Sequence, residues 1–214
     1  MIAFKYKSLR KFNHVADILS KKQFYASPFF KLNDPMEGLF KYDPIFTKKQ
    51  YIKEIKDAKG RSLICSFSKE STNILLWSYY ADGCRGICIE VDINDVQSYG
   101  CEIKTVNYSN SPISIPNDTV HLDPNIATTI LSQKYKAWKH EKEIRILSPN
   151  KYIREGVSVR SVLIGLRISN DRKNEICRIT PSGIPIYETY LDKTEIKKGA
   201  LLNANSLGQF HFKF

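Results

Sequence analysis

The chain has 214 residues, 42% of them hydrophobic and 26% charged, and a formal net charge of +11. This length fits one compact domain with an ample core, and no linker-like stretch marks a boundary, so we expect a single α+β domain over residues 1–214. No window approaches the ~18 apolar residues of a membrane-spanning helix, and no secretory signal begins the chain, so we expect a cytoplasmic protein without a membrane partner.

Hydrophobic periodicity divides the first part of the chain into short strands and amphipathic helices. Apolar residues recur at helical spacing from Leu9 to Leu19, which predicts a helix. Asp34 precedes a proline and Gly38 follows closely, which favours a loop. In chain order we expect strand 3–6, helix 9–21, strand 23–26, loop 31–38, helix 48–58, strand 62–67, helix 72–81 and strand 86–92.

The second part continues in the same way, with more strands than helices. Residues 102–108 are expected to pair with strand 86–92, and the three prolines within 110–124 indicate an irregular connection. The remaining expected elements are helix 126–138, strand 143–147, strands 160–167, 176–180 and 184–190, and a last strand through Phe210, Phe212 and Phe214. These patterns predict mixed, mostly antiparallel sheets flanked by about four helices.

Cysteines and histidines give no sign of a metal site. The five cysteines form no CxxC pair, and no histidine stands at zinc-finger spacing. We therefore expect reduced, mostly buried thiols and no bound metal.

Glu141 and Glu143 are the first candidates for chemistry. Two carboxylates two residues apart at the entry to a strand would project from one face, opposite Ile144 and Ile146. Close like charges raise at least one pKa, which suits general acid and base work or stabilisation of a developing cation. The same pattern also fits a solvated strand edge with Arg145 nearby.

Other polar and aromatic clusters are compatible with either a site or ordinary structure. Asn33, Asp34 and Glu37 lie in the expected loop, where they would line a site or form Asx-type turns. Trp77 and Tyr80 on one helix are typical of core aromatics as well as of a binding platform. No phosphate-binding lysine motif and no GxGxxG is present, which argues against ordinary nucleotide hydrolases and dinucleotide-dependent dehydrogenases.

The positive charge favours polyanionic partners such as nucleic acid or phosphorylated ligands. Lysines are spread along the whole chain, however, and neither an arginine-rich tail nor a stripe of interleaved aromatic residues stands out. A solvated surface explains this composition as well as a nucleic-acid partner does.

Several unusual motifs follow one another over residues 3–167. The motifs are Phe4-Lys5-Tyr6-Lys7-Ser8-Leu9, Phe24-Tyr25-Ala26-Ser27-Pro28, Leu32-Asn33-Asp34-Pro35-Met36-Glu37-Gly38, Ser66-Phe67-Ser68, Leu76-Trp77-Ser78-Tyr79-Tyr80-Ala81-Asp82-Gly83, Arg85-Gly86-Ile87-Cys88-Ile89-Glu90 and Trp138-Lys139-His140-Glu141-Lys142-Glu143-Ile144-Arg145. In this order the motifs resemble the bacterial and phage family known as domain of unknown function 2971. They also contain Arg85, Trp138 and Arg145, which we add to the site candidates named above.

A second resemblance is to the ADP-ribosyltransferase-like fold. It implies that Lys5, beside Tyr6, contacts the NAD ribose, that Ser27 lines the nicotinamide pocket, and that Glu143 acts on the nicotinamide ribose with Glu141 before it. Lys5 departs from the histidine or arginine of that family, and lysine lacks the arginine fork. The Ser-Thr-Ser signature is also missing.

Three functions stay open at this point. The first is an NAD-using transferase or glycohydrolase, in a toxin or phage-defence setting, with Asn33 and Asp34 shaping the pocket and a nucleic acid as an acceptor. The second is a non-catalytic protein that binds nucleic acid or takes part in phage–host protein interactions. The third is a metal-dependent nuclease with carboxylate ligands drawn from Asp34, Glu37, Asp82, Glu90 and Glu143.

Overall fold

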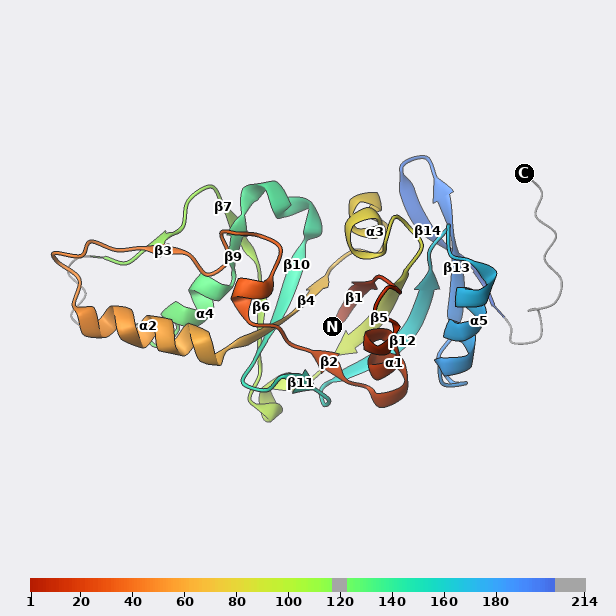
Figure 1. Ribbon diagram of the computed structural model, residues 1–214, viewed down its shortest axis with the longest axis horizontal. Helices are drawn as coiled ribbons and strands as arrows, with labels where there is room; N and C mark the ends of the chain where they lie inside the picture. Colours follow the sequence, from red (N-terminus) through yellow and green to blue (C-terminus); the bar gives the residue numbers. More distant parts are fainter. Residues whose placement is uncertain (117–122, 203–214) are drawn as a thin grey trace. The chain divides into compact units, whose positions relative to one another are not determined.

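A computed structural model describes residues 1–116 and 123–202. It shows a mixed α+β protein with a mostly antiparallel sheet, as predicted (Figure 1). The described residues form five α-helices and three short 3-10 helices, where the sequence predicted about four helices. The strand predicted through the three C-terminal phenylalanines lies outside the described residues.

The chain divides into two compact units, neither of which is continuous in sequence. Unit 1 consists of residues 1–24, 67–94 and the described residues from 154 onward, and unit 2 of residues 25–66 and 95–153. Strands β2 (Phe24–Tyr25) and β4 (Leu63–Ser68) each contribute residues to both units. The expectation of a single domain stays a prediction.

Unit 1 is built on five neighbouring strands in the order β14-β13-β12-β5-β1. Their bounds are β1 (Ile2–Lys7), β5 (Ile87–Ile93), β12 (Val157–Ile164), β13 (Ile186–Asp192) and β14 (Glu195–Leu201). Only β12 and β13 run parallel among these pairs, and the helix α5 (Asn170–Ile179) connects them, as a parallel pair requires.

The core of unit 1 gathers around Trp77. Helix α1 (Phe12–Lys21) packs against α5, and α3 (Ile74–Tyr80) packs against β1 (Figure 1). Asn73 caps α3 by accepting the Leu75 N–H at 2.9 Å, so the helix begins two residues later than the predicted residue 72. Trp77 is fully buried, and its indole N–H donates to the Ser71 carbonyl at 2.7 Å.

The chain leaves α3 through a left-handed turn at residues 82–84. Asp82, Gly83 and Cys84 have φ angles of 54°, 63° and 66°. Gly86 follows where the chain comes closest to β1, because a Cβ atom there would lie 2.2 Å from the Lys7 carbonyl oxygen. The turn therefore delivers the chain directly into β5.

Unit 2 contains short strands around two packed helices. Helices α2 (Lys49–Arg61) and α4 (Ile126–Leu131) lie side by side and bury Ile55 and Ile130 against Ile115 (Figure 1). The other elements are η1 (Phe29–Lys31), β3 (Phe40–Lys41), η2 (Val96–Tyr99), β6 (Glu102–Thr105), β7 (Asn107–Ser109), β8 (Ile113–Ser114), β9 (Gln133–Tyr135), η3 (Lys136–Glu141), β10 (Glu143–Ser148) and β11 (Tyr152–Ile153).

Three local predictions are wrong. The helix predicted over 126–138 ends at Leu131, because β9 pairs with β7 instead. The strand predicted over 176–180 belongs to α5, which Ser169 caps by accepting the Arg172 N–H. Residues 102–108 form β6 and β7, and β6 pairs with β10, while β5 pairs with β1 and β12.

Replacing Trp77 with alanine should lower the free energy of unfolding by about 3–5 kcal/mol, because it leaves a large cavity in the core of unit 1. Chemical denaturation would measure this loss. Tyr79→Ala on the same helix is the control, since Tyr79 is 60% exposed, and it should cost less than about 1 kcal/mol. Equal losses for the two variants would contradict the assigned packing.

Candidate functional site

The candidate site is a group of two cations and three carboxylates buried within unit 2. The side chains come from the 31–38 loop, β9, the end of η3 and β10. The members are Glu37, Lys134, Glu141, Glu143 and Arg145, each no more than 6% exposed. We call these five residues the charge cluster.

Arg145 stands at the centre of the charge cluster and is fully buried. Its guanidinium makes a double contact with Glu37, through Nη1 at 2.7 Å and Nη2 at 2.5 Å. A second double contact reaches Glu143, through Nε at 2.9 Å and Nη2 at 3.2 Å. Nη1 also donates to the Leu131 carbonyl. All five guanidinium N–H donors therefore have an acceptor.

Lys134 joins the remaining carboxylates. Its Nζ lies 3.0 Å from Glu143 Oε2, hydrogen-bonds to Glu141 Oε2, and lies 4.0 Å from Glu37 Oε1. The same ammonium lies 5.0 Å from the centre of the Trp138 ring. Glu141, Glu143 and Trp138 thus form a cage that holds one positive charge, and we call this the cation cage.

Glu141 and Glu143 do converge, but not by alternation along a strand. Glu141 ends η3, Lys142 adopts a left-handed backbone with φ 45°, and β10 begins only at Glu143. This turn brings both carboxylates to the Lys134 ammonium. Every residue of β10 is buried, so the alternative of a solvated strand edge is wrong.

The two cations determine the protonation of Glu143. Burial alone would raise the pKa of Glu143, but the charges of Arg145 and Lys134, with hydrogen bonds from Arg145 and Ser66, lower it to about 2. Burial would likewise lower the pKa of Lys134, yet Glu143 and Glu141 raise it. At neutral pH Glu143 is therefore a carboxylate and Lys134 an ammonium, which differs from the raised carboxyl pKa expected of two close like charges.

Glu37 behaves in the opposite way. Burial raises its pKa, and the hydrogen bond and charge of Arg145 do not fully offset that effect. The pKa values of Glu37 and Glu143 shift in opposite directions because the three carboxylates of the charge cluster share only two cations.

Neighbouring residues hold the charge cluster in place. Asp34 Oδ1 accepts the Met36 N–H at 2.9 Å in an Asx-type contact, and Oδ2 accepts the Tyr135 N–H at 3.0 Å. The Tyr108 hydroxyl accepts the Glu143 N–H at 2.8 Å, and burial raises the pKa of Tyr108 to about 12. Asp34 therefore fastens the 31–38 loop to the end of β9.

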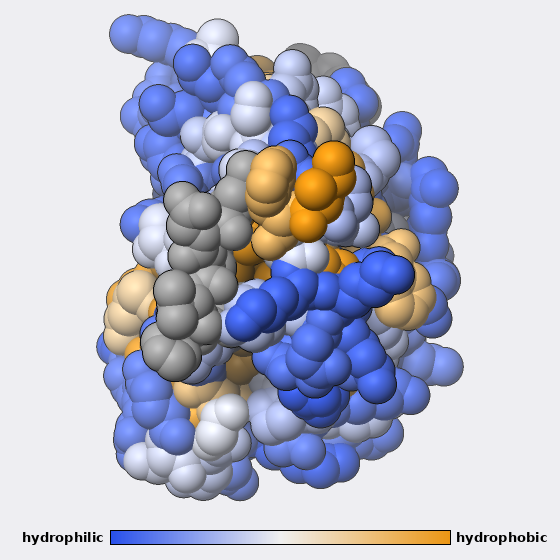
Figure 2. All heavy atoms as spheres, turned by 90° about the vertical axis from the view of Figure 1, so that its left-hand side faces the viewer, coloured by the Kyte–Doolittle hydropathy of each residue, from blue (hydrophilic) through white to orange (hydrophobic). Residues whose placement is uncertain are grey.

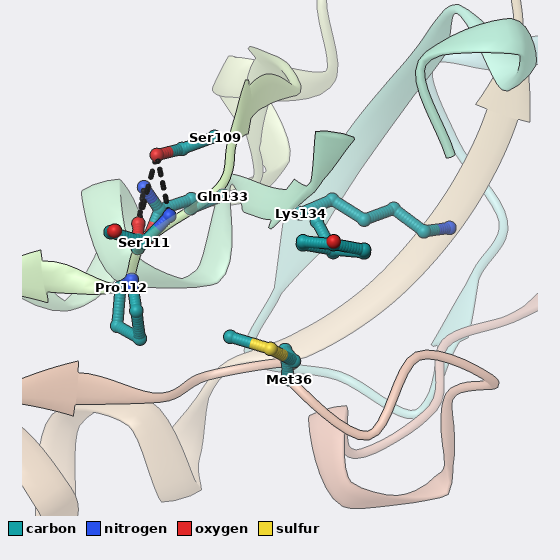
Figure 3. A pocket seen from close by; sticks show the side chains of 7 residues that line it. Met36, Ser109, Ser111, Pro112, Gln133 and Lys134 are labelled. Atoms are coloured by element: carbon teal, nitrogen blue, oxygen red, sulfur yellow. Dashed lines mark hydrogen bonds between the residues drawn. The ribbon is translucent and has the colours of Figure 1, made fainter. Parts of the chain in front are cut away.

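A small, shallow hollow borders this region of unit 2. It is lined by Met36, Ser109, Ser111, Pro112, Gln133, Lys134 and Tyr135. Figure 3 shows hydrogen-bonded Ser109, Ser111 and Gln133 on one side, with the Lys134 side chain running away from them. Lys134 thus belongs both to the wall of the hollow and to the charge cluster.

The remaining predicted residues of unit 2 lie in ordinary surroundings. Ser27 is half-buried, bridges to Ile64, and its hydroxyl donates to the Pro28 carbonyl at 3.3 Å. Asn33 is exposed.

Five other predicted site residues belong to unit 1. Lys5 Nζ lies 5.0 Å from the centre of the Phe67 ring, and the buried Tyr6 donates its hydroxyl to the Glu70 carbonyl at 2.8 Å. Trp77 and Tyr80 belong to the core of this unit. Arg85 is exposed, and its Nη1 lies 3.4 Å from the Asp82 carbonyl.

The carboxylates considered for a metal-dependent nuclease have other partners. Glu37 and Glu143 bind Arg145, Asp82 pairs with Arg10 at 2.6 Å, and Glu90 accepts from Ser161 at 2.5 Å. Across residues 1–116 and 123–202, no three histidine, cysteine, aspartate or glutamate side chains group as metal ligands. The helices in the same part of the chain include none that is both long and apolar enough to cross a membrane.

Sequence reasoning missed Lys134 and Tyr108. Lys134 falls within the helix predicted over 126–138, and no neighbouring residue in the sequence indicates that it is buried. Its partners are far away in the sequence or depend on the turn at Lys142. The pairing of β9 with β7, which places Lys134 in a strand, has no local signal either.

Comparison of the chain with protein-family models, curated proteins and solved structures finds no match. The resemblances to domain of unknown function 2971 and to ADP-ribosyltransferases therefore stay hypotheses drawn from the motifs.

Arg145→Met should lower the free energy of unfolding by about 3–5 kcal/mol, because Glu37 and Glu143 would lose their shared cation while remaining buried. Arg160→Met is the matched control. Its ion pair with Asp92 involves an arginine side chain that is 54% exposed, so it should cost less than about 1 kcal/mol. Urea denaturation of the two variants distinguishes them, and an unaffected Arg145→Met protein would contradict the assigned role.

Glu143 should also make stability depend on pH at the acidic end. Its pKa is lowered in the folded protein to about 2, so its contribution is present above the unfolded value near ~4.3 and is lost as pH falls toward 2. The difference in unfolding free energy between wild type and Glu143→Gln should shrink by roughly 3 kcal/mol between about pH 6 and pH 2. A difference independent of pH would refute the ionised assignment.

Proposed function

We propose that this protein is an NAD-using transferase or glycohydrolase that breaks the bond between nicotinamide and ribose. The observation that carries the proposal is the cation cage, in which Glu141, Glu143 and the Trp138 ring already hold one positive charge. Cleavage of this bond passes through an oxocarbenium-like ribose, which a fixed and ionised carboxylate stabilises.

Glu143 is the residue suited to stabilise that cation. Its pKa of about 2 keeps it ionised at neutral pH, and the Arg145 fork and the Tyr108 hydroxyl fix its position. A carboxylate oriented before the reaction needs no reorganisation when charge develops.

The proposed reaction has two steps. The bond from the ribose carbon to the ring nitrogen breaks, and nicotinamide leaves as a neutral molecule with the electron pair. Water or an acceptor hydroxyl then bonds to the ribose carbon, and Glu141 takes the proton that this nucleophile releases. The Lys134 ammonium occupies the cation cage in the free protein, so the mechanism requires it to give way to the ribosyl cation.

Nicotinamide release from NAD by the purified protein tests this proposal. Glu143→Gln should lower the rate at least about 100-fold, in the range of other electrostatic contributions to catalysis. Glu141→Gln should lower it less and should act most on the step that depends on the acceptor. Glu155→Gln, a change of the same kind at an exposed position, should leave the rate unchanged.

Circular dichroism and denaturation of each variant separate loss of activity from loss of structure. If Glu143→Gln does not fold, Glu141→Gln decides the question, because it leaves the Arg145 contacts with Glu37 and Glu143 intact. Absence of nicotinamide release by the folded wild type, with and without nucleic acid as an acceptor, would overturn the proposal.

A further inference from the structure

Residues 40–49 of unit 2 form an exposed loop in which aromatic and apolar residues stand between lysines at both ends. The loop runs from β3 to the first residue of α2. Its exposed members are Lys41, Tyr42, Pro44, Ile45, Phe46, Lys48 and Lys49. We call residues 40–49 the lysine-aromatic loop.

The apolar side chains of this loop are unusually open to solvent. Ile45 is 83% exposed, Phe46 63% and Tyr42 40%. Figure 2, which faces this side of the molecule, shows a hydrophobic patch bordered by hydrophilic side chains. Contiguous exposed apolar groups of this kind commonly mark interaction sites.

The backbone of the loop is held in a defined turn. The Ile45 N–H donates to Asp43 Oδ1 at 2.8 Å, and the Thr47 N–H donates to the Asp43 carbonyl at 2.9 Å. At its start, Phe40 packs against the core around Ile55, and the Tyr42 ring lies 5.8 Å from the Phe40 ring. The exposed groups are therefore presented by a turn anchored at its base.

The charges around the patch are mostly positive. Lys41, Lys48 and Lys49 are exposed, and Asp43, the acidic residue of the loop, uses a carboxylate oxygen within the turn. On the exposed side of α2, Lys53 and Lys56 stand beside the equally exposed Glu54 and Asp57, so the excess of positive charge lies in the loop itself. A partner for this surface must therefore combine negative charge with flat or apolar groups.

We infer that the lysine-aromatic loop binds single-stranded nucleic acid, with Tyr42 and Phe46 stacking on bases and the lysines contacting phosphates. Single strands offer both chemistries at once, since unpaired bases stack on aromatic rings while the backbone attracts cations. A duplex hides its base faces, so it would use only the charges. The net charge of +11 agrees with a polyanionic partner. This inference does not depend on the proposed NAD chemistry.

Fluorescence anisotropy of labelled oligonucleotides of about 20 nucleotides, thymidine for DNA and uridine for RNA, tests this inference. Phe46→Ala and Tyr42→Ala should each weaken binding to the preferred strand roughly tenfold, because one stacked base is worth ~1–3 kcal/mol. Replacing Lys48 and Lys49 with glutamine should reduce the slope of log affinity against log salt by about 1.4, at ~0.7 for each phosphate contact.

Controls use exposed residues of the other unit. Tyr190→Ala removes a ring that is 50% exposed, and Arg160→Gln removes an exposed cation, so both should bind as wild type does. A duplex of the same length should bind more weakly and should not respond to Phe46→Ala.

Three results would overturn the inference. One is unchanged affinity of the Phe46→Ala and Tyr42→Ala proteins for both oligonucleotides. Another is equal sensitivity of duplex binding to these changes. The third is binding to vesicles of anionic phospholipid that Phe46→Ala abolishes while single-strand binding persists, which would assign the loop to a membrane surface.

Discussion

The guanidinium of Arg145 is the interaction on which the interior of unit 2 depends. It satisfies all five of its donors on two carboxylates and one carbonyl, so segments far apart in the sequence meet at a single side chain. A buried ion pair of this kind adds little net stability compared with apolar packing, but removing one member is costly, because the other is left charged in a poorly solvated place. It therefore links the 31–38 loop, the end of α4 and β10 through one side chain.

Lys134 complements this arrangement in a different manner. Arginine fixes geometry through a rigid planar fork, whereas the lysine ammonium is a compact charge on a flexible stem. The charge cluster thus combines a rigid cation that holds carboxylates in position with a second cation on a flexible stem, the one that the proposed mechanism displaces. That contrast makes the cation cage a reasonable place for a substrate cation, and it explains why the proposed chemistry assigns movement to Lys134 and rigidity to Arg145.

The elements that the sequence predicted well have a strong local signal. The helices that begin near Phe12 and Lys49 show clear apolar periodicity. The strand of Ile87–Ile93 begins with three consecutive apolar residues and then alternates between acidic and apolar residues. The errors fall where tertiary pairing overrides local preference. The segment of Gln133–Tyr135 continues a helical pattern, yet it pairs with β7, and no local rule reveals that partner.

The same contrast between local signal and tertiary structure explains why only part of the site could be predicted. Spacing alone suggested that Glu141 and Glu143 act together, and the loop composition suggested Glu37, but the left-handed Lys142 and the burial of Lys134 are properties of the folded chain. The lysine-aromatic loop carries no such signal, because its aromatic and apolar residues follow no regular period. Only the exposed fractions of Ile45 and Phe46 distinguish it from a loop that buries its apolar groups.

The burial of Lys134 makes the reactivity of its amine a measure of local opening in unit 2. Most of the protein's lysines lie on the surface and would react with an amine-directed acylating reagent at once, while the Lys134 ammonium is enclosed by carboxylates and a ring. Its labelling must wait for unit 2 to open locally, so the rate of modification at this one position reports how often the charge cluster comes apart.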